Sequence, residues 1–144
     1  MTVYRILNGK SDDSVFTVPP ETTLTEAAKI LAEKRIGTVV ISKDGKVADG
    51  ILSERDVVRV LAMRGAGVLA DRVTDHMTTK LVTCTRKDTA ESVMQKMTAG
   101  RFRHMPVVEE GQMVGIISLG DAVKARLSEV SMEKDALEGM IMGH

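Results

Sequence analysis

Short apolar runs alternate with amphipathic segments along the chain, which predicts small units of the order β-α-β-β-α. In the first half, residues 15–18 are rich in β-formers and stop at Pro19-Pro20, so they predict a brief strand. Thr23 and Glu26 have the capping-box spacing that marks the start of a helix. Apolar residues then recur at helical spacing and predict one buried face, made of Leu24, Ala27, Ala28 and Leu31.

The next segment predicts a β-hairpin followed by a second helix. Residues 36–41 and 47–52 are rich in β-branched and aliphatic residues, and a turn at Asp44-Gly45 separates them. Residues 56–63 then show helical spacing, and Gly65-Ala66-Gly67 predicts its end. Three side chains of this helix are expected to face inward: Val57, Val60 and Leu61.

The second half repeats this order, which predicts an internal duplication. Strands are expected at 81–85, 102–108 and 113–117, with a helix over 89–99 and a turn at 109–112. At an offset of 66 (83 − 17 = 66), several Thr, Arg and Gly residues of the first half align with identical residues of the second half. The matched pairs are Thr17 and Thr83, Thr23 and Thr89, Arg35 and Arg101, and Gly45 and Gly111.

A short motif, Gly-apolar-apolar-Ser-x-x-Asp, occurs once in each half. It spans Gly50–Asp56 and Gly115–Asp121, at an offset of 65 (118 − 53 = 65). One interpretation is structural, because Ser before a helix accepts from free backbone N–H groups and Ser-x-x-Asp is a variant of the capping box. The other is a nucleotide pocket, since a helix N-terminus suits a phosphate and a nearby carboxylate can accept from two ribose hydroxyls. The duplication favours the second interpretation.

Composition excludes several classes of protein. The 144 residues carry 20 basic and 20 acidic side chains, so no strong field attracts nucleic acid or an anionic membrane. The aromatic residues are only Tyr4, Phe16 and Phe102, too few for a base-stacking platform. Cys84 is the lone cysteine, expected to be a small buried hydrophobe, and three scattered His residues do not predict a metal site. With no apolar run long enough to span a membrane and no signal-peptide core, a soluble cytoplasmic protein is expected.

The same residues resemble the tandem CBS-motif pair, or Bateman module, of inosine-monophosphate dehydrogenase and chloride channels. The resemblance covers about residues 10–128 and is carried by the repeated motif, by Arg103–Val108 and by the link Val73–Thr78. It is closest to small stand-alone bacterial pairs. It implies an α/β (α+β) fold of two repeats related by a pseudo-two-fold axis. It also implies a regulatory role without catalysis, with clefts for AMP, ADP, ATP, NAD or S-adenosylmethionine.

The resemblance also implies which residues form each cleft. Cleft A takes Ser53 and Asp56, with Leu81 and Val82 along the adenine, Arg103 and His104 toward the phosphate, and Met105 and Pro106 beside them. Cleft B takes Ser118 and Asp121 with Val15, Phe16, Gly37 and Thr38. Gly37 and Thr38 stand where cleft A has Arg103 and His104, so cleft A is expected to hold phosphate better. Three basic residues are candidate substitutes in cleft B: Lys34, Arg35 and Arg55.

The C-terminal stretch predicts a helix with an apolar seam. Its seam positions follow spacings of 4, 3, 4, 3 and 4, with one polar member, and are Val123, Leu127, Val130, Lys134, Leu137 and Ile141. This seam and the resemblance favour a homodimer. The predicted organisation is an N-terminal segment over 1–14, the two motifs over 15–64 and 81–128 with a linker over 65–80, and a helical extension over 129–144.

Two other functions remain open from the sequence. A small nucleotide hydrolase would require a general base or a metal cluster beside the phosphate, and no such group converges in the sequence. A structural or interaction protein would use the two Ser-x-x-Asp motifs as helix caps only. Binding of an adenosine ligand separates the regulatory function from the structural one, and turnover of the ligand separates it from the enzyme.

Overall fold

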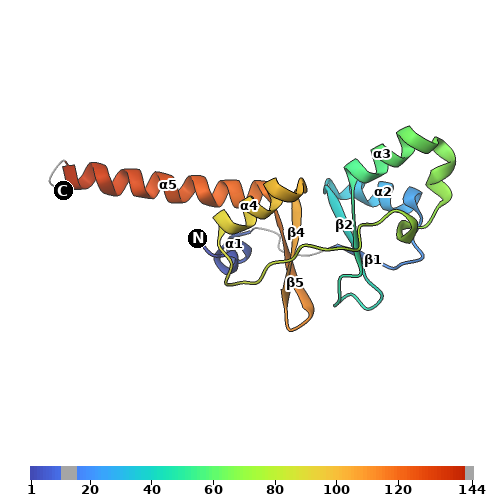
Figure 1. The fold of residues 1–144 in the computed structure, drawn as a ribbon, viewed down its shortest axis with the longest axis horizontal. Coiled ribbons are helices and arrows are strands. Elements are labelled where there is room, and N and C mark those ends of the chain that lie inside the picture. The colour runs from blue at the N-terminus through green and yellow to red at the C-terminus, as the bar shows by residue number, and fades with distance from the viewer. Residues whose placement is uncertain (11–15, 142–144) are drawn as a thin grey trace. The chain divides into compact units, whose positions relative to one another are not determined.

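The computed structural model describes residues 1–10 and 16–141 and divides into two compact units (Figure 1). Unit 1 comprises Met1–Asp13, Thr83–Val107 and Gly115–His144, and unit 2 comprises Ser14–Val82 and Val108–Val114. Both mix helices with small sheets, which confirms the α/β (α+β) class. In the described part of the chain, no helix is both long and apolar enough to cross a membrane.

Unit 2 is built on a three-stranded sheet of order β1-β2-β3. β1 (Thr17–Val18) runs parallel to β2 (Thr38–Ile41), and β2 pairs antiparallel with β3 (Gly50–Ser53). Two helices, α2 (Leu24–Lys34) and α3 (Glu54–Arg64), pack with this sheet (Figure 1) and are followed by the 3₁₀ turns η1 (Ala66–Ala70) and η2 (Val73–Asp75). Their buried side chains form one core: Val18, Leu24, Ala27, Leu31, Val39, Ile41, Leu52, Val57, Val68 and Val73.

The sequence predicts α2 well and α3 with one error. Thr23 and Glu26 form the expected capping box on α2, and the expected apolar face of that helix packs into the core. In α3, Val57 is buried and Val60 packs against the core, whereas Leu61 is 37% exposed, so its inward placement is wrong. Val57 is the residue of α3 that is buried, so the inward face of this helix is narrower than its apolar spacing predicts.

Unit 1 contains three helices: α1 (Val3–Gly9), α4 (Ala90–Gly100) and α5 (Leu119–Ile141). β4 (His104–Glu109) and β5 (Gln112–Ser118) pair with each other, and their residues 108–114 group with unit 2. α4 packs along the N-terminal part of the 23-residue α5 (Figure 1). The buried side chains of unit 1 include Val3, Ile6, Leu7, Cys84, Val93, Met97, Met105, Val107, Ile117 and Ala122. The burial of Cys84 confirms that it acts as a small hydrophobe.

One expected strand does not form. Within residues 81–85 only Cys84 is bridged, to Val107, and its N–H donates to the carbonyl of Pro106 at 3.0 Å. Pro106 has no N–H with which to donate the next ladder bond, which explains why the pairing stops after one residue.

The duplication is visible in backbone conformation as well as in element order. Arg35 and Arg101 end α2 and α4 with φ of 53° and 56°, in the left-handed region that few residues other than glycine adopt. Gly45 and Gly111 occupy the hairpin turns with φ of 77° and 79°. Residues paired by the sequence offset therefore share the same backbone conformation.

The glycine that opens each copy of the motif lies under a neighbouring side chain. A Cβ atom on Gly115 would lie 2.8 Å from Cδ2 of Leu7, which α1 buries, and Met77 covers Gly50 in the same way. The absent side chain thus lets α1 pack directly onto β5.

Gly115→Ala should therefore lower the free energy of unfolding by about 1–3 kcal/mol, the usual range for overpacking a core. Urea denaturation followed by circular dichroism measures it. Gly139→Ala is the matched control, because no atom lies within 4 Å of that site in α5. Alanine should raise helix stability there by up to about 1 kcal/mol. Equal effects of the two changes would contradict the packing explanation.

Candidate functional site

Ser53 and Asp56 form a capping box where β3 passes into α3. Ser53 pairs with Thr38 in the β2–β3 ladder and is the last residue of its strand, so the sheet fixes its position. The Asp56 N–H donates to Oγ of Ser53 at 3.2 Å, and Oδ2 of Asp56 accepts from the Ser53 N–H and Oγ, each at 2.9 Å. Arg59 lies 3.0 Å from the other carboxylate oxygen, Oδ1. The predicted cap is confirmed.

Ser118 and Asp121 repeat this geometry where β5 passes into α5. The Asp121 N–H donates to Oγ of Ser118 at 3.0 Å, and Oδ2 of Asp121 accepts from the Ser118 N–H at 2.9 Å. The positively charged partner of the aspartate differs between the two copies, Arg59 in the first and Lys10 in the second. Lys10, directly after α1, donates from Nζ to Oδ2 of Asp121 at 2.9 Å and to the carbonyl of Ile116 at 3.1 Å.

This ion pair changes the protonation of Asp121. Burial acts to raise its pKa, but the N–H of Ser118 and the ammonium of Lys10 together hold the pKa below its ordinary value of 3.8. Asp121 therefore stays ionised at lower pH than an ordinary aspartate does.

The geometry agrees with the comparisons to known proteins. The CBS domain family matches residues 11–63 and 73–128, which together span most of the chain. The chain belongs to the CBS domain family. It carries two CBS motifs in tandem.

A plant relative and two solved structures illustrate the likeness. The mitochondrial CBS domain-containing protein CBSX3 of Arabidopsis thaliana is 34% identical over 140 residues, which are 94% of this chain and 68% of that protein. The CBS-domain containing protein ATU1752 of Agrobacterium tumefaciens has a TM-score of 0.83 and 42% identity, covering 88% of this chain and 99% of that one. The CBS domain protein PAE2072 of Pyrobaculum aerophilum, solved in complex with AMP, has a TM-score of 0.73 and 25% identity, with 84% and 89% covered. Five longer Arabidopsis relatives also match, and the chain spans 22% to 26% of their length.

The other residues expected in the clefts of this CBS pair fall into both units. In unit 2, Leu81 is half-buried, Val82 is exposed, Thr38 is buried, and the carbonyl of Gly37 accepts from the Glu54 N–H at 2.9 Å. In unit 1, Arg103 is exposed, His104 is half-buried, and Met105 and Pro106 are buried. Val15 lies outside the described residues. Each predicted cleft combines residues of the two units, so the assembly of clefts A and B stays a prediction.

One cation beside the second CBS motif was not suggested by the sequence, while Lys34, Arg35 and Arg55 stay predictions for cleft B. Lys34 lies over the ring of Phe16, 5.6 Å from its centroid, within unit 2. Lys10 is the cation that contacts Asp121, and sequence inspection missed it because the two residues are 111 positions apart. The available signal was weak: three apolar residues at helical spacing, Val3, Ile6 and Leu7, which dock α1 and thereby deliver Lys10.

Potential metal ligands do not gather around these motifs in the described part of the chain. No three His, Cys, Asp or Glu residues there are grouped so that they could hold a metal ion. The aspartates of the two motifs bond within helix caps and to an arginine or a lysine.

The Lys10–Asp121 pair predicts a specific pH dependence. A carboxyl whose folded pKa is lowered stabilises the fold above its unfolded pKa, and that contribution is lost as pH falls through the folded pKa. Removing the ammonium in Lys10→Met raises the folded pKa of Asp121. The gap in unfolding free energy between wild type and variant should thus be full at about pH 6, begin to shrink near pH 4 and close only as pH falls through the lowered folded pKa of Asp121.

Chemical denaturation at a series of pH values measures this gap. Lys96→Met is the control, because Lys96 is an exposed residue of α4 with no ion pair among the described residues. The difference in unfolding free energy between Lys96→Met and wild type should be small and independent of pH. If the difference for Lys10→Met stayed unchanged at acid pH, the stabilising role of the Lys10–Asp121 ion pair would be contradicted.

Proposed function

We propose that this CBS pair is a regulatory module that binds an adenosine-containing ligand, with AMP as the first candidate and ATP or NAD as others, and does not consume it. The observation that carries the proposal is the pair of strand-to-helix junctions at Ser53–Asp56 and Ser118–Asp121. Each places a hydroxyl, a helix N-terminus and an ionised or paired carboxylate within one helical turn.

The chemistry of a nucleotide suits such a junction. The two neighbouring ribose hydroxyls donate to a carboxylate, and a phosphate accepts from helix N-terminal N–H groups and from the serine. The AMP complex of the Pyrobaculum aerophilum relative supports this ligand class. In cleft A, Arg103 and His104 would add charge-assisted donors to the phosphate.

Two alternative functions, a purely structural cap and a nucleotide hydrolase, account for fewer of these observations. If the motifs were caps only, the capping box and the helix dipole would account for an aspartate at each junction, but they would not account for the family likeness to nucleotide-binding proteins. A hydrolase would require a base or a metal beside the phosphate, and no three His, Cys, Asp or Glu residues in the described part of the chain are grouped so that they could hold a metal ion.

Three variants test the ligand and the roles of its contacts. Asp56→Ala should weaken AMP at the tighter site at least about tenfold, because hydrogen bonds to a charged acceptor are each worth about 1.5–3 kcal/mol. Arg103→Ala should weaken AMP far more than adenosine, since in this proposal it faces only the phosphate. Asp121→Ala should leave the tighter site largely intact. Calorimetric titration of AMP and adenosine gives all three comparisons.

Asp56→Asn separates ligand binding from capping. Its amide oxygen can still accept from the Ser53 N–H, so stability should be largely kept while the charge that receives ribose is lost. Should both Asp variants lose stability while every titration stays unchanged, the motifs are caps and the proposal fails. If AMP is converted during the titration, the protein is an enzyme.

We further propose that two copies of the chain pair through α5. The helix is 23 residues long, about 35 Å at 1.5 Å per residue, and its C-terminal half buries little against its own unit. Seam residues are strongly exposed, with Leu127 at 65% and Ile141 at 84%. Their 4-3 spacing fits a second helix of the same kind, and burial of this stripe would remove apolar surface from water.

Charge placed on the seam should separate the copies. Leu127→Glu/Leu137→Glu is expected to shift the mass measured by light scattering from twice 15.6 kDa to the single-chain value of 15.6 kDa. Ala136→Glu, which adds the same charge off the seam, should leave the dimer intact. A wild-type protein that scatters as a single chain at high concentration would refute the pairing.

A further inference from the structure

A pocket of about 470 Å³ lies within unit 1, between α1 and α5. Its lining follows the periodicity of the two helices, since positions one helical turn apart share a face. From α1 and its flanks it takes Met1, Arg5, Ile6, Gly9 and Lys10, and from α5 it takes Asp121, Lys124, Ala125 and Ser128. Ile6 and Ala125 are buried and form an apolar floor. The volume falls in the range of small-molecule sites, about 300–1,000 Å³.

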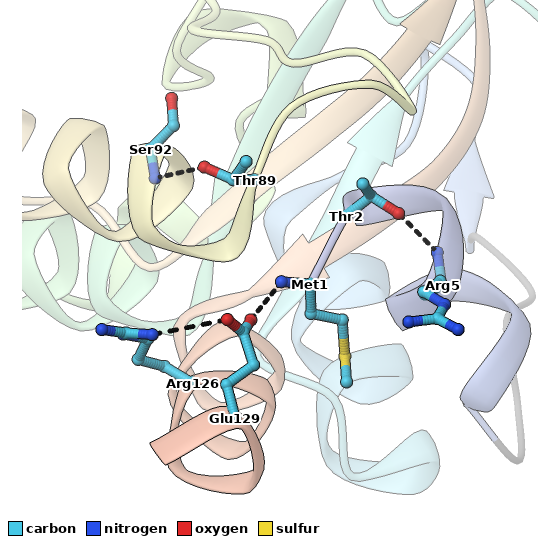
Figure 2. Close-up of polar contacts among 7 residues, drawn as sticks. All are labelled: Met1, Thr2, Arg5, Thr89, Ser92, Arg126 and Glu129. Carbon is cyan, nitrogen blue, oxygen red and sulfur yellow. Dashed lines mark hydrogen bonds and ion pairs between the residues drawn. The ribbon is translucent and has the colours of Figure 1, made fainter. Parts of the chain in front are cut away.

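Positive charge dominates this pocket. Lys10 and Asp121 neutralise each other. The Met1 amino group is paired with Glu129, which also accepts from Arg126 at 3.4 Å (Figure 2). Arg5 and Lys124 are the remaining charged groups of the lining. Within the described ranges 1–10 and 16–141, neither side chain has an ion pair or a hydrogen bond, and in Figure 2 only the backbone N–H of Arg5 is bonded, to Thr2.

Two unpaired cations on facing helices point to a ligand of the opposite charge. Arg5 is on α1 and Lys124 on α5, and the docking of Val3, Ile6 and Leu7 holds α1 in place. A guanidinium offers a planar fork of donors and an ammonium a compact charge, and both favour phosphate oxygens. Ser128 adds a hydroxyl to the same wall. One monovalent anion would leave one of the two cations unmatched.

We propose that this pocket binds a phosphate-type polyanion of the pyrophosphate class, held by Arg5 and Lys124. The anion is either free or the phosphate chain of a nucleotide whose ribose contacts Asp121 on the pocket rim. The second case rests on the proposed function, and the first does not. In both cases, α1 and α5 would supply the positive charge that binds phosphate at the second CBS motif. The two residues that the resemblance placed there, Gly37 and Thr38, are uncharged.

The test uses inorganic pyrophosphate as the probe, titrated calorimetrically into the full chain. Arg5→Gln and Lys124→Gln should each weaken binding about tenfold, the scale of one lost charge-assisted hydrogen bond. Lys96→Gln removes the same charge from the exposed face of α4 and should change nothing. Both target side chains are exposed, so unchanged melting curves are expected and confirm that the variants fold.

Two further titrations separate the sources of the anion. For a nucleotide chain, ATP should bind more tightly than AMP at the site that Asp121→Ala removes, and Arg5→Gln/Lys124→Gln should abolish that advantage. For a free anion, pyrophosphate binding should survive Asp121→Ala while ATP shows no advantage over AMP.

The proposal is overturned if pyrophosphate fails to bind and ATP has no advantage over AMP, or if Arg5→Gln/Lys124→Gln binds both as wild type does. Retained pyrophosphate binding in a protein that binds no adenosine ligand would support this pocket while refuting the nucleotide function. The two failures are thus distinguishable.

Discussion

The junction between a buried strand and the helix that follows it is the constraint on which both halves of the chain depend. Ser53 is held by the β2–β3 ladder, and its hydroxyl and N–H are bonded within the first turn of α3. The four free N–H groups of a helix start need such acceptors. Gly50 and Gly115 complete the junctions, because their missing side chains admit Met77 and Leu7 against the strands. A change in any of these positions disturbs strand, helix and carboxylate together.

Features set by local interactions could be predicted from the sequence. The capping residues Thr23, Ser53 and Ser118, the hairpin glycines and the buried face of α2 all follow from residues within one or two turns of each other. The repeat paired Arg35 with Arg101 in sequence, but it did not predict the left-handed conformation that the two share. Family resemblance then supplied the candidate ligand class, which no local pattern contains.

The errors and omissions have a different origin, in contacts between distant segments. α1 has only seven residues, too few for an isolated helix to be stable in water, and it depends on packing of Val3, Ile6 and Leu7. Lys10 reaches Asp121 only because of that packing. The expected strand at 81–85 failed because its partner carries Pro106, and Leu61 is exposed because α3 buries a narrower face than its spacing predicts. Each of these outcomes depends on which distant segment a residue contacts, and the spacing of residues along the chain does not determine that.

The capping and ligand-binding interpretations of Ser-x-x-Asp are compatible because a carboxylate has two oxygens. In both copies the cap uses Oδ2, which accepts from the serine N–H at 2.9 Å. Oδ1 takes no part in this cap bond. At Asp56 the described partner of Oδ1 is the exposed side chain of Arg59, and a flexible exposed arginine is displaced at little cost. At Asp121 the lysine bonds Oδ2, the oxygen already used by the cap. In the proposed function the ribose hydroxyls would bond Oδ1 of each aspartate, so the cap and the ligand would use different oxygens of one carboxylate.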